Sequence, residues 1–114
     1  MSAEVREAIA QAANAVDGIH VSAYFRQTTK PGDGMVRLER INRDTSGFGY
    51  MNIWQVLVVL PQDIAQAEQY LDEKVSDLVE AISEELIVTS VTPQQLALDT
   101  GTIPVVLIEG NRAT

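Results

Sequence analysis

An apolar stretch followed directly by a long amphipathic stretch constrains the fold more than any other feature of this chain. Residues 52 to 60 carry branched and aromatic side chains on both alternating faces, which predicts a central β-strand covered on two sides. Pro61 ends this strand, and Asp63 with Gln66 three residues later resembles a helix-capping box. An apolar stripe then recurs at steps of three and four, through Ile64, Ala67, Leu71, Val75, Leu78, Ile82 and Leu86. This stripe predicts a helix of about 22 residues, roughly 33 Å long.

Weaker patterns supply the other elements. Helical spacing of apolar residues over about residues 3 to 16, closed by Gly18, predicts a first helix. Two-residue alternation predicts a half-buried strand over residues 19 to 25, and further strands over 85 to 92 and 102 to 109. Asp99, Thr100 and Gly101 form a turn signal between the last two. We therefore expect an α/β (α+β) fold, with a mixed, mainly antiparallel sheet of about four or five strands, two helices packed on one face and a long extended loop.

Composition limits the class of protein. With 114 residues, of which 46% are hydrophobic, the chain is expected to form a single domain over residues 1 to 114. It has no cysteine, which excludes a disulfide framework and thiolate metal sites. The longest apolar run, residues 56 to 60, is too short to span a bilayer, and no signal-peptide pattern opens the chain. A soluble protein made in the cytoplasm is the expectation.

Residues 26 to 49 read differently from the rest. This segment contains Pro31 and four glycines, with a short strand-like stretch at residues 35 to 41. We interpret it as a long extended hairpin or arm. Connections of this length are uncommon in compact domains unless they have a function, so the arm is a functional candidate.

The charges of the chain are segregated. Residues 26 to 43 hold five basic and two acidic residues, a net charge of +3, whereas residues 63 to 85 hold eight acidic residues against Lys74, a net charge of −7. Unlike surfaces on one molecule suit a head-to-tail contact between copies. The candidate interface residues are Arg26, Lys30, Arg37, Arg40 and Arg43 on the basic side and Glu73, Asp77, Glu80 and Glu84 on the acidic side. Solvated surfaces, a DNA-repelling wall and, least favoured, a divalent-cation site are the alternatives for the acidic group.

No pattern for chemistry emerges from the residues. The single histidine, His20, lies in a predicted strand with no evident Ser-His-Asp arrangement, and no His or acidic residues have metal-ligand spacing. The glycines lack the ending of a phosphate-binding loop, and the net charge of −8 argues against nucleic-acid binding. We predict no catalytic residue, no metal and no cofactor. Trp54 is expected in the core, although Phe48, Tyr50 and Trp54 could instead mark a contact surface.

Two stretches carry a resemblance to a known family. The sequence NIWQVLVVLPQDIAQAEQYLDEKVSDLVEAI, followed by LIVTSVTPQQLALDTGTIPVVLIEGNR, resembles the small tail terminator proteins of long-tailed bacteriophages, which are minor tail or neck proteins. The order of elements is similar over nearly the whole chain, with the arm at the place of the family's variable loop.

The resemblance implies a structural protein of the virion, located in the tail-neck region, and not an enzyme. It implies a homo-oligomeric ring, a hexamer, that caps the tail tube and joins it to the connector proteins of the head and neck. DNA would pass through the lumen without specific binding. The family supplies no fixed residue motif, so the interface residues above rest on charge alone.

Three alternatives stay open at this point. Another neck component, such as a head-completion protein, would differ only in its binding partner. A small ligand-binding regulatory domain would need a closed apolar pocket with convergent polar groups. An enzyme would need His20 beside a carboxylate and a nucleophile.

Overall fold

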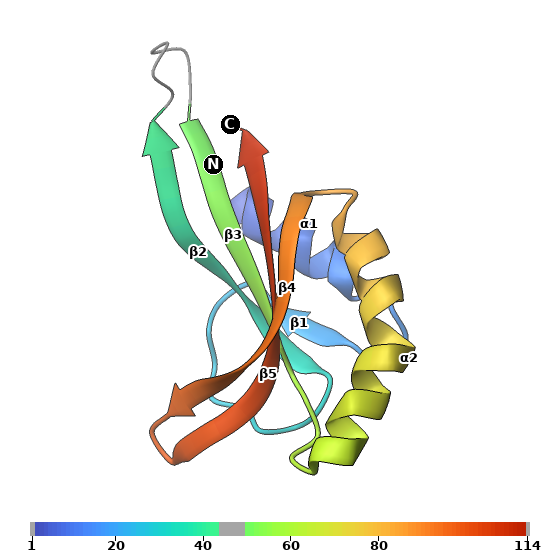
Figure 1. Ribbon diagram of the computed structural model, residues 1–114. Helices are drawn as coiled ribbons and strands as arrows, with labels where there is room; N and C mark the ends of the chain where they lie inside the picture. The colour runs from blue at the N-terminus through green and yellow to red at the C-terminus, as the bar shows by residue number, and fades with distance from the viewer. Residues whose placement is uncertain (1, 44–49, 114) are drawn as a thin grey trace.

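The chain forms two helices and one five-stranded sheet over the residues described by the computed structural model, 2–43 and 50–113. The elements are α1 (Ser2–Ala13), β1 (His20–Ser22), β2 (Asp33–Arg43), β3 (Tyr50–Val59), α2 (Ile64–Ile82), β4 (Ile87–Leu98) and β5 (Gly101–Ala113) (Figure 1). The strand order is β1-β2-β3-β5-β4, with β1 parallel to β2 and the other neighbours antiparallel. This mixed, mainly antiparallel α+β architecture confirms the predicted fold class.

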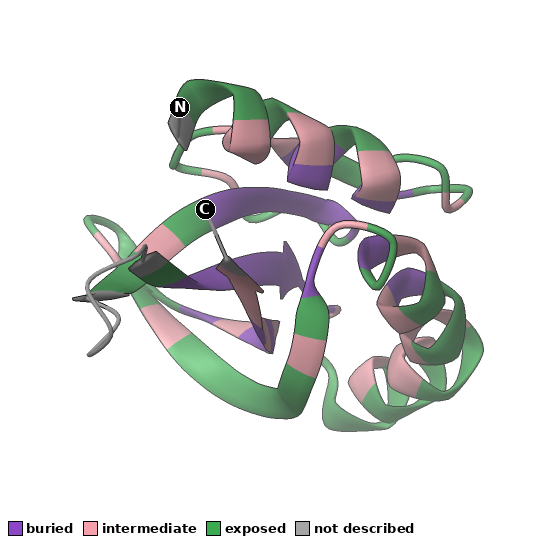
Figure 2. Cartoon of the chain, turned by 90° about the horizontal axis from the view of Figure 1, so that it is seen from above, coloured by how far each residue is buried: buried purple, intermediate pink, exposed green. Residues whose placement is uncertain are grey.

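Both helices cover the same face of the sheet, which we call the helical face (Figure 2). Ile9 of α1 and Leu78 and Ile82 of α2 pack there against alternate residues of the strands. Trp54 of β3 belongs to this cluster and is fully buried, so the prediction that it is a core residue is confirmed. Truncating a side chain of this size in such a core typically costs about 3–5 kcal/mol.

The opposite side, which we call the open face, has a smaller core of its own. Met35 of β2 and Leu57 of β3 belong to a buried cluster that Leu96 and Leu98, at the far end of β4, also contact. Leu96 pairs across the ladder with Ile103 of β5, another member of this cluster, so the β4–β5 hairpin contributes to the core of this face. The bend of the β4–β5 hairpin is visible at the lower end of the sheet (Figure 1). Because β3 contributes residues to both clusters, residues 52 to 60 are buried on both faces, as their composition predicts.

Several predicted boundaries shift, for identifiable reasons. The first helix ends at Ala13, where the backbone bonds tighten, since the N–H groups of Ala15 and Val16 donate to residues three positions earlier. The side chain of Asn14 joins this end of the helix to β1, accepting from the N–H of Val21 at 2.6 Å and donating to its carbonyl at 3.1 Å. The following strand is correspondingly short, residues 20 to 22. The N-cap of α2 is as predicted, since the carboxylate of Asp63 accepts from the N–H of Gln66 at 3.0 Å.

The end of α2 and the last two strands also differ from expectation. Helix α2 stops at Ile82, so Leu86 is buried in the turn that follows, and Ile64 at the start of the stripe is 81% exposed. Strand β4 begins later than predicted and continues through Pro93 to Leu98. Proline is tolerated at this position because β4 is an edge strand.

The segment predicted as an arm divides into distinct parts. Residues 26 to 32 form a loop, and residues 33 to 43 form β2, which lies between β1 and β3 in the protein's own sheet. The outer ends of β2 and β3 form a hairpin that projects from the body (Figure 1). Phe48 and the rest of residues 44 to 49 lie outside the described residues, as does the side chain of Tyr50.

Candidate subunit interface

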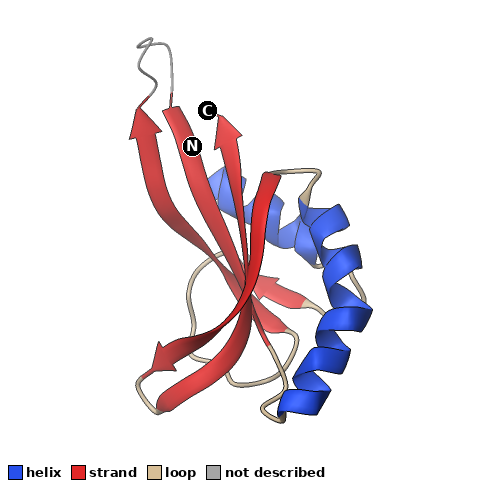
Figure 3. Cartoon of the chain, viewed as in Figure 1, coloured by secondary structure: helices blue, strands red, loops and turns tan. Residues whose placement is uncertain are grey.

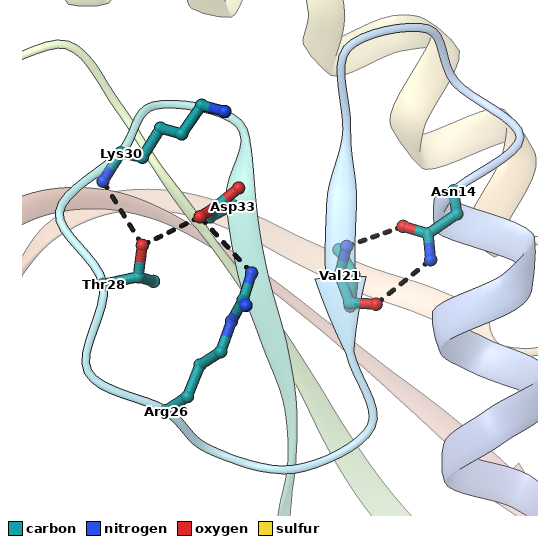
Figure 4. Close-up of polar contacts among 6 residues, drawn as sticks. All are labelled: Asn14, Val21, Arg26, Thr28, Lys30 and Asp33. Atoms are coloured by element: carbon teal, nitrogen blue, oxygen red, sulfur yellow. Dashed lines mark hydrogen bonds and ion pairs between the residues drawn. The ribbon is translucent and has the colours of Figure 1, made fainter.

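A buried carboxylate organises the loop that carries two of the predicted basic residues. Asp33, at the start of β2, accepts a hydrogen bond from the hydroxyl of Thr28 at 2.9 Å and pairs with the guanidinium of Arg26 at 3.3 Å (Figure 4). The Thr28 hydroxyl in turn accepts from the backbone N–H of Lys30 at 3.3 Å. Arg26 is therefore held by its own chain, while the Lys30 side chain remains exposed.

A glycine is required where this loop meets the rest of the protein. Gly32 has a φ of +92°, and a Cβ at this position would lie 2.4 Å from the carbonyl oxygen of Gly18. The hydroxyl of Tyr70 on α2 also lies close by, 3.2 Å from that Cβ position. Burial, and secondarily the Asp33 carboxylate, raise the pKa of Tyr70 above its ordinary value.

A β-bulge places Arg37 and Arg40 on the same face of the sheet. Residues three apart in a regular strand point to opposite faces. The register of β2 against β3 shifts between Leu38 and Arg40, however, with Glu39 as the extra residue. Both arginines therefore lie on the open face, and both are exposed. Arg40 contacts Glu39 at 3.5 Å, an exposed pair worth about 0–1 kcal/mol.

The acidic group lies on and beside α2. Glu73, Asp77 and Glu80 are exposed on the helix. Glu84 was expected on the same side of this helix but lies in the turn after Ile82, because the helix ends earlier than predicted. Asp77, Glu80 and Glu84 nevertheless line one open hollow of about 360 Å³, together with Asp17 from the turn after α1.

The two charged groups are only partly separated in space. The outer part of β2, with Arg37 and Arg40, lies away from α2 (Figure 3), whereas the loop that carries Arg26 and Lys30 approaches α2 at Tyr70. Among the described residues, no ion pair joins a basic residue of the first group to an acidic residue of the second. Arg43 ends β2, and its side chain lies outside the described residues. The charge pattern is thus available for contacts with other molecules.

Features that would support other classes of site are few. No group of three or more His, Cys, Asp or Glu residues within the described ranges is arranged to hold a metal ion. His20 is exposed and is the strand neighbour of Asp33, but the Asp33 carboxylate is engaged by Thr28 and Arg26. A catalytic triad requires a histidine that is hydrogen-bonded to a carboxylate and a hydroxyl. Within residues 2–43 and 50–113, no such bond to His20 is present.

A groove of about 450 Å³ lies between the start of α2 and the β4–β5 hairpin. Its walls include Leu60, Ile64, Pro93 and Pro104, and it is open to solvent rather than enclosed. No described helix combines the length and apolar character needed to cross a membrane. No protein-family model matches the chain, and no curated protein sequence matches it either.

The sequence analysis identifies the charged residues of this surface but not the residues and strand features that position them. Asp17 and Asp77 are 60 positions apart, so no local pattern connects them. The bulge at Glu39 and the burial of Asp33 depend on strand pairing. One feature of this region is visible in the sequence. Residues 86 to 98 contain no charged side chain, and this stretch includes all of β4.

Proposed function

We propose that this protein is a tail terminator of a long-tailed bacteriophage, a structural protein that forms a ring, caps the tail tube and joins it to the neck. The observation that carries the proposal is the separation of the basic outer part of β2, in the projecting hairpin, from the acidic residues of α2 in a small α+β domain. Such a molecule can repeat head to tail, so that the basic side of one copy faces the acidic side of the next. The order of the elements resembles that of the tail terminators, and this resemblance is the reason for assigning the ring to the phage tail.

The mechanism of such a ring is geometric. One rim matches the last layer of the tail tube, and its binding removes the surface on which further tube subunits would add. The other rim presents a docking surface to the connector proteins of the neck. DNA passes through the lumen, where the net charge of −8 per copy disfavours adhesion to phosphates.

Charge alone would give a weak ring. Exposed ion pairs contribute about 0–1 kcal/mol each, so Arg37 and Arg40 together would account for at most about 2 kcal/mol per junction. That corresponds to a change of up to about 30-fold in the dissociation constant. Charge therefore sets the orientation of the copies, and another contact must supply most of the affinity.

The test has a cellular and a biochemical part. Phage particles assembled without this protein should have overlong tails, or heads and tails that fail to join, when viewed by electron microscopy. Normal particles would refute the proposal, and tailless heads with normal free tails would favour a head-completion protein.

In solution, the Arg37→Gln/Arg40→Gln variant should form rings more weakly than the wild type, by native mass spectrometry or sedimentation in the presence of tail tubes. The Gln11→Glu/Gln62→Glu variant is the matched control, because both changed residues are exposed and the net charge changes by the same amount. Equal assembly of the two variants would remove the arginines from the interface.

A further inference from the structure

The sheet ends in two strand edges that no other described strand covers along most of their length. Strand β4 is the last strand on one side, and among the described strands it pairs with β5 alone. On the other side β1 pairs with β2 only at residues 33 to 35, so the outer edge of β2 from Arg37 to Arg43 extends beyond it. Exposed edges offer unpaired N–H and C=O groups to another chain.

The two edges are protected very differently. The free part of β2 carries four charged residues and a bulge, features that discourage pairing with a foreign strand. Strand β4 is longer and carries no charged residue between Ile87 and Leu98. Its residues 89 to 95 are all exposed, and Ile87 leaves 72% of its surface in solvent. Pro93 and a register shift near Thr89 are the interruptions along this edge.

The direction of the free backbone groups on β4 can be derived from one hydrogen bond. The carbonyl of Pro104 in β5 accepts from the N–H of Leu60 at 2.9 Å, on the side away from β4. Pro104 is the register partner of Gln95, so these two residues form a pair that exchanges no backbone bonds. The N–H and carbonyl of Gln95 therefore point outward. Every second residue of the strand directs its backbone groups to the same side, so the N–H and carbonyl of Val91 also point outward. Pro93, between Val91 and Gln95, has the same orientation, and its missing N–H therefore breaks no bond with β5.

We propose that the β4 edge of one copy pairs in an antiparallel manner with the outer edge of β2 in the next copy, which makes the sheet continuous from subunit to subunit. The proposal rests on the ring of the proposed function and names its main contact. Strands β2 and β4 run in opposite directions, because three antiparallel steps separate them. A rotation about an axis along the strands preserves strand direction, so the neighbour's β2 arrives antiparallel to β4.

Charge selects the second copy's β2, rather than its β4, as the occupant of this edge. The first turns of α2 lie beside β4, where Glu68 lines the same groove as Pro93, Gln94 and Gln95. Pairing of two β4 strands would bring two copies of the Glu68 carboxylate toward each other, whereas β2 belongs to the segment of net charge +3. Arg37 and Arg40 would continue on the open face beside Thr92 and Gln94 of β4, so they would steer the approach while backbone hydrogen bonds hold the copies.

A proline scan tests the backbone contact. Gln95→Pro removes an outward N–H and leaves the β4–β5 ladder intact, whereas Gln95→Ala removes the same side chain and keeps the N–H. We expect Gln95→Ala to form rings like the wild type and Gln95→Pro to need at least about 10-fold higher concentration, equivalent to about 1.4 kcal/mol per junction. Urea denaturation of the monomer must give similar midpoints for both variants. Equal assembly of the two would overturn the proposal.

Engineered cysteines give a second measurement that does not depend on the proline variant folding. The natural chain has no cysteine, so every disulfide formed is informative. Chains with Thr92→Cys or Gln94→Cys are mixed with chains carrying Arg37→Cys or Arg40→Cys, since a continuous sheet places all four on the open face. Oxidation should give mixed disulfides between a β4 and a β2 cysteine. Only β4–β4 disulfides, or none in any combination, would refute the proposed pairing.

The outcomes also separate this inference from the proposed function. Rings that form normally in Gln95→Pro, without mixed disulfides, would leave the terminator role intact and reject the strand contact. Mixed disulfides from a protein whose loss leaves phage particles normal would support the strand contact and reject the terminator role.

Discussion

Replacing Arg6 should destabilise the fold, because this one side chain joins three parts of the structure. Arg6 projects from α1, and its guanidinium lies over the rings of Tyr24 and Trp54, with its central carbon 4.8 Å and 5.3 Å from their centroids. The same group donates from Nη1 to the carbonyl of Ala23 at 3.3 Å and to that of Val36 at 3.2 Å. It thus ties the first helix to the β1–β2 connection and to β2.

The expected magnitude follows from these contacts. A cation over an aromatic ring is worth about 0.5–1 kcal/mol at a partly exposed site, and Arg6 has two such contacts. Hydrogen bonds from a charged donor contribute about 1.5–3 kcal/mol when well formed. The two here are long and share one nitrogen, so we count about 1 kcal/mol for both. Arg6→Ala should therefore cost about 2–3 kcal/mol of the free energy of unfolding.

Urea denaturation followed by fluorescence measures this cost directly, since Trp54 is the only tryptophan. With a urea slope of about 1–3 kcal/mol per molar for small proteins, the midpoint should fall by about 0.7–3 M. Arg6→Lys keeps the charge but not the planar group, and we expect it to recover less than half of the loss. A stability of Arg6→Ala within about 0.5 kcal/mol of the wild type, the usual range for a surface substitution, would refute the reasoning.

Three further substitutions test other parts of the structure. Gly34→Ala would place a Cβ 2.3 Å from the carbonyl oxygen of Leu57, so it should lower stability by about 2–3 kcal/mol in the same denaturation assay; an unchanged midpoint would contradict that contact. Asp63→Ala removes the N-cap of α2 and should cost about 0.5–2 kcal/mol, whereas Asp63→Ser should retain most of the stability. Because the pKa of Tyr70 is raised above 10.0 in the folded state, its protonated form is favoured there: the associated stability is complete below that pH and is lost as pH rises through the folded-state pKa. Tyr70→Phe should be less sensitive to alkaline pH than the wild type, and identical pH dependence of the two would exclude the burial argument.

The elements that could be predicted from sequence are those whose signals are local. The apolar run at residues 52 to 60, Pro61 and the capping carboxylate of Asp63 all lie within twelve positions, and together they located β3 and the start of α2. The end of α1 was wrong because its cause is not local. The side chain of Asn14 bonds the backbone of Val21 in β1, seven residues away, and this contact fixes the position at which the chain leaves the helix.

The candidate surface shows the same limit. The sequence analysis names Arg26 as a candidate interface residue, yet its guanidinium is paired with Asp33, seven residues away across a loop. The spacing of Arg37 and Arg40 predicts opposite faces in a regular strand, and only the pairing with β3 reveals the bulge that brings them together. The edge position of β4 could not be predicted either, because β5 follows β4 in sequence but lies between β3 and β4 in the sheet.

The uncharged edge of β4 and the acidic side of α2 are best understood as one arrangement. A strand edge twelve residues long without a charged side chain would be an aggregation hazard if every copy could use it against every other. The carboxylate of Glu68 on α2 lines the groove beside Pro93, Gln94 and Gln95 of β4, so two β4 edges approach each other against repulsion. Repulsion of this kind leaves the strand available only to a surface of opposite charge, and the basic β2 edge is such a surface. Charge would thus restrict the β4 edge, which could otherwise pair with many strands, to the β2 edge of the next copy. A ring of identical subunits requires a contact of this kind between two different surfaces.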